Sequence, residues 1–399
     1  NMVHPLFYRI FSDKNESPEN SGLFSLLEIK EASPLTQEKE QYMRLALALA
    51  QKGEGHVAPN PLVGCVIVKD GRIIAEGWHE RFGGPHAEKN ALAHCTEDPA
   101  GAALFVTLEP CCHYGKTPPC TQAIIASGIR KVFVGCVDPN PNVAGKGIAA
   151  LRQAGILVEE GVLEEPCRRI NERFFHFITT KKPFVALKYA MTLDGKIATA
   201  TGESRWITGI TARNHVQRLR KQYSAILVGI GTVLADDPLL TCRIDPEASP
   251  LRVICDRKLR LPLESQLVQT ARQSPVLVLT QTDGEKAEAL RAQGVEVVCF
   301  PHLTMKEAVD ELGRRNIDSL LVEGGSQILG AFVQEGIGER VFAYLAPKIL
   351  GGYHAPSPIG GPGIGALEDA WTLTDREPIF LGEDLLWTGR VRHHVYGLD

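Results

Sequence analysis

The chain has 399 residues, which is longer than most single hydrophobic cores and favours two domains. Its net charge of −4, with 23% charged residues, excludes the broad basic surface of a non-specific nucleic-acid-binding protein and favours a small-molecule substrate. Ten scattered cysteines without a secretory pattern, and no apolar run near the ~20 residues of a membrane span, predict a soluble cytoplasmic protein with few or no disulfides.

The first predicted elements follow a segment without any motif that carries chemistry. Residues 1–35 combine a polar stretch with an apolar one, and we interpret them as an N-terminal extension, either native or added to the native chain. Apolar residues at helical spacing then predict a helix with Thr36 as its N-cap, which ends at Gly53. Residues 63–68 and 72–77 predict two strands joined by a hairpin turn at Asp70-Gly71.

Strands and helices then alternate, which predicts a largely parallel sheet with helices packed on it. The predicted elements are a helix from His86, a strand at 103–108, a helix from about Cys120, a strand at 131–137, and helices at 144–154 and 167–180. Lys181-Lys182-Pro183 interrupts the last helix, so we place a domain boundary there, with the first domain at 36–181 and the second at 182–399.

The second domain is predicted to be α/β as well. Its short buried strands are expected at 184–190, 225–229, 252–255, 276–279, 295–300 and 319–322, with helical segments between several of them. The sequence shows no internal repeat that would make this domain a copy of the first.

One group of residues in the first domain indicates metal chemistry. Pro85-His86-Ala87-Glu88, followed by Pro110-Cys111 and later Cys120, matches the known zinc-deaminase signature of H-x-E with a following P-C and a second cysteine. An imidazole and two thiolates, from His86, Cys111 and Cys120, leave the fourth tetrahedral position of a zinc ion for water. The metal lowers the pKa of that water and makes it a nucleophile.

Glu88 is predicted to be the proton carrier of this site. It lies two residues after His86, about 200° around a helix, and so cannot be a ligand on the same helix face. A carboxylate there can take a proton from the water and give it to the ring nitrogen and the departing ammonia.

The residues alone leave alternatives to a catalytic zinc site. Eight residues separate Cys111 from Cys120, whereas the general signature has two, and Cys112 and His113 lie next to Cys111. Either neighbour could complete a closed structural site, and each residue alone could be an ordinary helix-terminal histidine or buried thiol. At the level of function, the alternatives are a nucleic-acid base deaminase and a non-catalytic zinc scaffold.

Longer motifs resemble the bifunctional riboflavin-biosynthesis deaminase-reductases of RibD type. The resemblance runs from about Thr36 to the C-terminus and is carried by Ala58-Pro59-Asn60-Pro61-Leu62-Val63-Gly64, Pro85-His86-Ala87-Glu88, residues 107–120, Asp138-Pro139-Asn140-Pro141, residues 188–196 and residues 231–238. It implies a cytidine-deaminase-like α/β/α domain followed by a dihydrofolate-reductase-like α/β domain. Wide cysteine spacing is normal in this family, which implies Cys111 and not Cys112 as the ligand. The implied contacts to the pyrimidine ribosyl phosphate are Asn60, His113, Lys116, Asp138 and Asn140.

In the second half, two glycine turns follow predicted strands. Gly324-Gly325 precedes a helical segment at 327–335, and Gly229 to Thr232 leads into Asp236-Asp237-Pro238. Such turns let backbone N–H groups approach a dinucleotide phosphate, but they are also common as plain tight connections. The G-x-G-x-x-G pattern of Rossmann folds is absent from both.

The family resemblance implies that this domain binds NADPH and reduces the opened ribosyl group to a ribityl chain. The implied cofactor residues are Ala190, Trp206, Thr232, Asp236, Gly325, Ser326, Gln327, Ile328, Leu329, Gly330 and Ala331. The implied substrate residues are Lys188, Ser204, Arg220, Leu240, Arg243 and Glu323, with Lys188 and Asp236 assisting the reaction. We therefore expect a bifunctional enzyme with one Zn²⁺ per chain, small-molecule substrates, no nucleic-acid or membrane partner, and a homo-oligomeric state of two or four chains.

Overall fold

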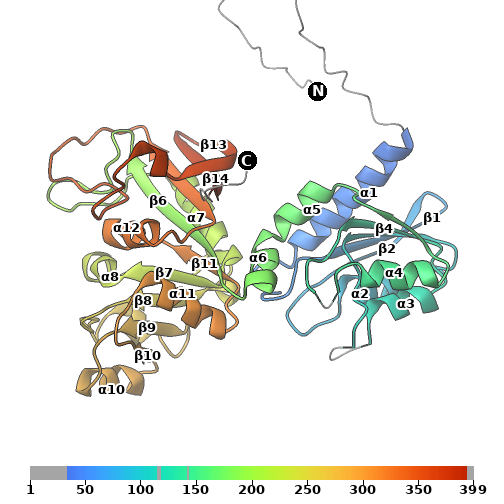
Figure 1. The fold of residues 1–399 in the computed structure, drawn as a ribbon, viewed down its shortest axis with the longest axis horizontal. Helices are drawn as coiled ribbons and strands as arrows, with labels where there is room; N and C mark the ends of the chain where they lie inside the picture. The colour runs from blue at the N-terminus through green and yellow to red at the C-terminus, as the bar shows by residue number, and fades with distance from the viewer. Residues whose placement is uncertain (1–33, 115–117, 142, 393–399) are drawn as a thin grey trace, which may run out of the picture.

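The computed structural model describes residues 34–392 with the exception of 115–117 and 142. The predicted extension, up to residue 33, and Lys116 therefore lie outside the described residues. Two α/β units follow one another along the chain and meet at helix α6 (Figure 1). In the described part of the chain, no helix is long and apolar enough to cross a membrane.

The first unit is built on a mixed sheet. Within the described residues its strands, in the order β2-β1-β3-β4-β5, are β2 Arg72–Trp78, β1 Gly64–Lys69, β3 Ala103–Leu108, β4 Lys131–Cys136 and β5 Leu157–Glu160. β1 is antiparallel to both neighbours, while β3, β4 and β5 are parallel, so the expectation of a largely parallel sheet is correct for those three only. The hairpin forms at Asp70-Gly71, where both residues have positive φ values of 47° and 72°, as a type I′ turn requires.

Helices cover both faces of this sheet and make the predicted α/β/α sandwich. They are α1 Pro34–Gln51, α2 Ala87–Ala93, α3 Cys120–Ala126, α4 Lys146–Gln153, α5 Glu164–Ile170 and α6 Glu172–Thr180. One buried cluster joins the sheet to α2, α3 and α4, and another joins its opposite face to α1, α5 and α6.

Two sequence-based expectations for these helices are wrong. α1 begins at Pro34, ahead of the expected Thr36 N-cap. The single helix expected at 167–180 is two helices, because Asn171 leaves helical geometry between them. The Asn171 side chain instead bonds the backbone of Leu62, accepting from its N–H at 2.8 Å and donating to its carbonyl at 2.9 Å.

The second unit contains a nine-stranded sheet in the described region, ordered β10-β9-β8-β7-β11-β6-β12-β14-β13. Its strands are β6 Phe184–Thr192, β7 Ala225–Gly229, β8 Leu251–Cys255, β9 Val276–Thr280, β10 Glu296–Cys299, β11 Ser319–Val322, β12 Arg340–Ala346, β13 Thr372–Leu381 and β14 Asp384–Arg392. The run from β10 to β12 is parallel, and β14 and β13 extend it antiparallel. The last three strands in the chain were not expected. β13 is mostly exposed and has Asp375, Arg376 and Glu377 at its centre, so it does not show the pattern of a buried strand.

Helices cover this sheet on both sides. They are α7 Ile210–Gln222, α8 Ile230–Asp236, α9 Gln266–Gln269, α10 Glu285–Ala292, α11 Met305–Arg314 and α12 Ser326–Gln334. Along the central strands, alternate side chains point to opposite faces of the sheet. One set packs in a buried cluster with α11 and α12, and the other set packs in a second cluster with α8, α9 and α10. These packed helices hold the strands in place and so position the loops at their carboxyl ends. In open α/β sheets, ligands bind at these loops.

Candidate active sites

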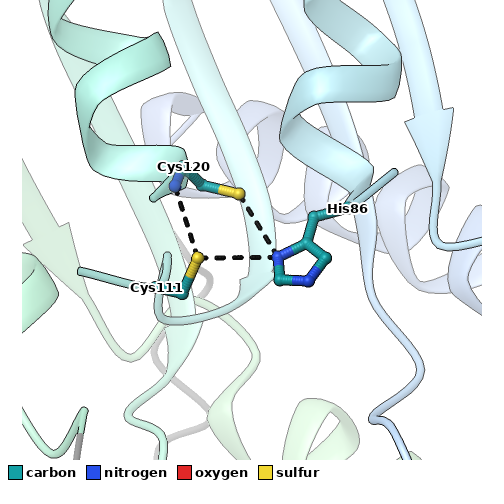
Figure 2. A group of neighbouring side chains, drawn as sticks. All are labelled: His86, Cys111 and Cys120. Atoms are coloured by element: carbon teal, nitrogen blue, oxygen red, sulfur yellow. Dashed lines mark hydrogen bonds between the residues drawn. The ribbon is translucent and has the colours of Figure 1, made fainter. Parts of the chain in front are cut away.

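Three side chains in the first unit converge in the way that a metal site requires. His86 immediately precedes α2, Cys111 lies in the turn after β3, and Cys120 is the first residue of α3. The His86 Nδ1 atom lies 3.5 Å from Cys111 Sγ and 3.4 Å from Cys120 Sγ, as Figure 2 shows. The backbone N–H of Cys120 also donates to Cys111 Sγ at 3.3 Å.

These distances fit a zinc ion. With Zn–S of about 2.3 Å and Zn–N of about 2.05 Å, tetrahedral angles place the sulfur and nitrogen ligands about 3.5 Å apart. Within the described chain, the residues with ligand atoms close enough to share an ion are His86, Cys111 and Cys120, and neither Cys112 nor His113 joins them. The arrangement is therefore that of a three-ligand site with an open position, as in catalytic zinc centres.

The two cysteine sulfurs titrate as a pair. The pKa of Cys111 is lowered to about 4, chiefly by a hydrogen bond from the Cys120 side chain, and the pKa of Cys120 is raised by the same bond and by burial. Side chains alone thus stabilise one thiolate. A divalent cation supplies the charge that a second thiolate needs.

Glu88 lies on α2 and is 3% exposed. Burial raises its pKa, and the neighbouring Cys111 charge raises it further. Among the described residues, the group whose ligand atoms could share an ion consists of His86, Cys111 and Cys120, and the role of Glu88 stays a prediction. A carboxyl group with a raised pKa beside a metal site can both accept and release a proton.

Sequence reasoning missed His79, which is buried next to the metal ligands. Its ring packs edge-on against His86 with centroids 5.5 Å apart. Its Nδ1 atom lies 2.9 Å from the Pro85 carbonyl, so Nδ1 carries the proton and Nε2 accepts from the Asn60 amide at 3.1 Å. This hydrogen bond uses the amide N–H of Asn60 and so fixes the orientation of its side chain. The histidine seven residues before His86 lies outside the H-x-E motif, so the motif alone did not indicate it.

Three of the other expected substrate residues of this unit, His113, Asp138 and Asn140, lie around the same turn. Asp138 is buried, and burial raises its pKa to about 6. The backbone N–H of Asn140 donates to the Asp138 carboxylate at 2.8 Å. The exposed His113 and the Cys111 sulfur both act electrostatically on Asp138. The fold thus brings these residues together near Cys111, while their roles remain predictions.

The second unit has a large cavity of about 1150 Å³ at the carboxyl ends of its strands. Every residue expected at the cofactor or the sugar substrate lines it, with the exception of Gly330. Gly330 packs against Gly360, where a Cβ would lie 2.2 Å from the Gly360 carbonyl oxygen. Its small size therefore serves helix packing and not direct contact with a ligand in this cavity.

A buried charge network lies at one wall of this cavity. Glu323 receives a two-pronged ion pair from Arg220, with both N–O distances at 3.0 Å, and Lys188 Nζ lies 3.5 Å from the same carboxylate. Burial alone would raise the pKa of Glu323, but Arg220 and Lys188 lower it to about 2. The carboxylate is therefore ionised at neutral pH and holds both cations in place.

Further residues line the cavity that sequence reasoning did not identify. Arg205 lies 3.4 Å from the Asp236 carboxylate, and Arg213 lies over the Trp206 ring at 4.5 Å from its centroid. The Tyr344 phenol bonds His215 Nδ1 at 2.7 Å, beneath Lys188. Single arginines and tyrosines carry no sequence signal of their own, so only the fold reveals that they meet.

Two protein-family models match the chain. The zinc-binding region of cytidine and deoxycytidylate deaminases matches residues 36–136, and the RibD C-terminal domain matches residues 183–382.

Whole proteins also resemble the chain over most of its length. RibD of Actinobacillus pleuropneumoniae is 53% identical over 350 residues, covering 86% of this chain and 93% of that protein. RibD of Escherichia coli (strain K12) is 41% identical over 360 residues, covering 87% and 97% respectively. A crystal structure of a diaminohydroxyphosphoribosylaminopyrimidine deaminase/5-amino-6-(5-phosphoribosylamino)uracil reductase from Thermotoga maritima has a TM-score of 0.82 and 42% identity, covering 90% of this chain and 100% of that chain. One of Acinetobacter baumannii RibD has a TM-score of 0.80 and 38% identity, with the same coverage.

Proposed function

Because this chain belongs to the RibD family of bifunctional deaminase-reductases of riboflavin biosynthesis, we propose that it carries out two successive steps on one pyrimidine. The first is hydrolytic deamination of 2,5-diamino-6-ribosylamino-4(3H)-pyrimidinone 5′-phosphate. The second is NADPH-dependent reduction of the ribosyl group of 5-amino-6-(5-phosphoribosylamino)uracil to ribityl.

The observation that carries the first step is the convergence of His86, Cys111 and Cys120 beside the buried Glu88. His86, Cys111 and Cys120 would hold zinc there, and the ion would lower the pKa of a bound water so that it can act as the nucleophile. Glu88 would carry one proton from the water to the ring nitrogen and a second, from the oxygen once it has added to the ring carbon, to the amino group, which then leaves as ammonia. Asn60, oriented by His79, is available to accept from a pyrimidine N–H group.

The pyrimidine and its ribosyl phosphate are held by groups of matching chemistry. Asp138 and Asn140 read polar edges of the ring and the sugar, and His113 and Lys116 meet the phosphate from the loop after Cys111. This assignment is supported by the family resemblance and, for Asp138, Asn140 and His113, by their position around the metal ligands.

In the second step the 1150 Å³ cavity holds NADPH and the sugar substrate together. Bound NADPH would supply the hydride for C1′ of the opened ribosyl group, and the residues of this cavity would orient the two molecules for its transfer. The N-terminal residues of α12 with Thr232 and Trp206 receive the cofactor. The substrate meets Ser204, Leu240 and Arg243, together with the Arg220–Glu323–Lys188 network, in which the cations are already oriented by Glu323.

We further propose that the deaminase and reductase domains divide between residues 181 and 182. α6 ends at Thr180 and β6 begins at Phe184, so the linker between the two domains is very short.

All ten cysteines are free of disulfide bonds, which suits a reducing cytoplasm.

A homo-oligomer of two or four chains is supported by large apolar side chains exposed on the second unit. The group comprises Ile349, Tyr353, Leu367, Phe380 and Trp387. Such side chains commonly become buried when copies associate. Size-exclusion chromatography with light scattering measures this, and a monomer at micromolar concentration contradicts it.

The deciding experiment for the proposed function is incubation of the protein with the diaminopyrimidine phosphate, with and without NADPH, followed by mass spectrometry. Deamination raises the mass of the substrate by about 1 Da as an amino group is replaced by oxygen, and reduction adds about 2 Da as hydride and proton are added. We expect the first change without NADPH and both with it. No ammonia release with a zinc-loaded protein contradicts the deaminase assignment.

A further inference from the structure

A buried carboxylate, Glu109, lies between the metal-ligand turn and the loop that carries Asp138. Glu109 follows β3 directly and stands two residues before Cys111, and it is 4% exposed. One of its oxygens, Oε2, accepts from the backbone N–H groups of Asp138 at 3.3 Å and Gly145 at 2.9 Å. Its other oxygen accepts from Gly147 at 2.9 Å and Ile148 at 3.2 Å.

Four backbone donors on the two oxygens match the accepting capacity of a carboxylate side chain. A carboxylate offers two oxygens with about four lone-pair sites, whereas an amide side chain offers one oxygen and two donors. Gly145, Gly147 and Ile148 belong to the first turn of α4, whose N–H groups have no partner within the helix and favour a negative charge. The Glu109 side chain therefore accepts hydrogen bonds both from the N–H groups at the start of α4 and from the N–H group of Asp138.

The backbone packs tightly at the same point. A Cβ on Gly147 would lie 2.0 Å from the Pro110 carbonyl oxygen, so the start of α4 rests directly on the residue before Cys111. Gly145 has φ of 81°, a conformation that glycine adopts without strain. The metal-ligand turn and the start of α4 are thus in contact through backbone atoms, with Glu109 bonded across them.

The Asp138 loop depends on this arrangement for its placement. Glu109 holds the Asp138 N–H, and the Asp138 carboxylate in turn accepts from Asn140 N–H at 2.8 Å. We propose that Glu109 is a positioning residue of the deaminase, which sets Asp138 and Asn140 at the right place relative to the zinc ligands. This inference rests on the deaminase function proposed above. Because Glu109 acts on groups that hold substrate and not on Glu88, its loss weakens substrate binding more than it slows the chemical step.

The test is Glu109→Gln in the full-length, zinc-loaded protein. Glutamine keeps the size of the side chain but turns an NH₂ group toward two of the buried N–H donors. We expect the deaminase KM to rise about tenfold or more while kcat changes less than about threefold, because ground-state contacts are lost. Zinc content and reductase activity stay at the parent level. Glu165→Gln, the same substitution at an exposed position on α5, is the matched control and keeps parent kinetics.

Hydrogen exchange of the same variant tests whether Glu109 holds the Asp138 loop, independently of any activity measurement. We expect faster amide exchange in residues 138–148 of Glu109→Gln and unchanged exchange in α2. Parent-like exchange in residues 138–148 overturns the inference, and so does a fall in kcat at constant KM or a loss of zinc. If the parent protein releases no ammonia, the proposed deaminase function fails, while the exchange result still decides whether Glu109 holds the loop.

Discussion

Two buried carboxylates, Glu88 and Glu323, have pKa values shifted in opposite directions by their neighbours. Glu88 has its pKa raised by burial and by a nearby thiolate, which suits a group that exchanges protons. Glu323 is also largely buried, at the cavity wall, but Arg220 and Lys188 lower its pKa to about 2, which suits a group that stays charged and orients cations. The same residue type thus serves two purposes, and its ion-pair partners decide which.

At Glu88, the change to Gln removes the proton carrier but leaves the size of the side chain. We expect Glu88→Gln to lower ammonia release by at least about a hundredfold, since general acid-base catalysis contributes on that scale. Zinc measured by atomic absorption and NADPH oxidation with the deaminated substrate should equal those of the parent. Ammonia release at the parent rate would contradict the proton-carrier role.

At Glu323, the lowered pKa predicts a dependence of stability on pH. Unfolded glutamate has a pKa of about 4.3, so the network stabilises the folded state above that pH and loses this contribution as pH falls toward the folded pKa of about 2. Glu323→Gln should flatten the fall in free energy of unfolding over this range and abolish reductase activity, while ammonia release persists. Urea titrations at a series of pH values measure the free energy of unfolding of the parent and the variant. If both lose stability equally as pH falls, the network does not contribute to stability in this way.

At the scale of elements, short helices place the functional groups by their first turns. His86 and Cys120 stand at the beginnings of α2 and α3, where unpaired N–H groups favour thiolate and carboxylate charge. In the second unit, the N-terminal residues of α12 line the cofactor cavity, and the helix is held by the close contact of Gly330 with Gly360. The position of a helix start is therefore set by packing further along the same helix.

This predicts that Gly330→Ala acts on the cofactor without touching it. The added Cβ meets the Gly360 carbonyl oxygen and must push α12 away from its loop, which costs about 1–3 kcal/mol of stability. We expect a higher NADPH dissociation constant in fluorescence titration. Gly365→Ala, where a Cβ meets open space, is the control, and equal NADPH affinity in the two variants would contradict the packing role.

At the scale of the whole molecule, the two units meet through a buried ion pair next to their short connection. Glu172 on α6 accepts hydrogen bonds from the Nε and Nη2 atoms of Arg340 on β12, each at 2.9 Å, and both side chains are largely buried. A second contact joins His56 of the first unit to Asp245 of the second at 3.1 Å. These contacts fix the units against each other, while each active site is built from residues of one unit.

Removing Arg340 should therefore destabilise the protein strongly. Arg340→Met removes the two-pronged partner of the largely buried Glu172 and leaves its charge incompletely compensated by the half-exposed Arg390 at 3.5 Å, so the cost approaches the about 3–5 kcal/mol of a broken buried ion pair. The double variant Glu172→Gln with Arg340→Met removes that uncompensated charge and should recover most of the loss in urea unfolding. A double variant as unstable as the single one would show that packing, and not charge, dominates the contact.

Since the two sites are separate, removal of the metal should abolish the deaminase activity and leave the reductase activity unchanged. Dialysis against a chelator is expected to abolish ammonia release while NADPH oxidation with the deaminated substrate continues, and added zinc should restore the first. Loss of both activities in step with zinc would contradict independent sites.

Features that depend on residues close together in the sequence could be predicted from it, whereas features that depend on contacts between distant residues could not. His86, Glu88, Cys111 and Cys120 could be predicted from the sequence because few residue types bind zinc or carry protons, and each lies within a short motif. The structure brings the three predicted ligands together. The buried parallel strands could be predicted since each is a short apolar run between polar turns. The exposed β13 had no such pattern, and its place in the sheet follows from pairing with β14.

The sequence by itself determined the chemistry of the zinc site, the α/β class of both units and, through its motifs, the family. Only the tertiary structure decided which distant residues meet. Arg220 and Glu323 are 103 positions apart and Glu109 and Gly147 are 38 apart, so no local pattern links them. The physical reason is that ligand identity is a property of single side chains, whereas placing a charge or a loop depends on burial and on hydrogen bonds that exist only once the chain has folded.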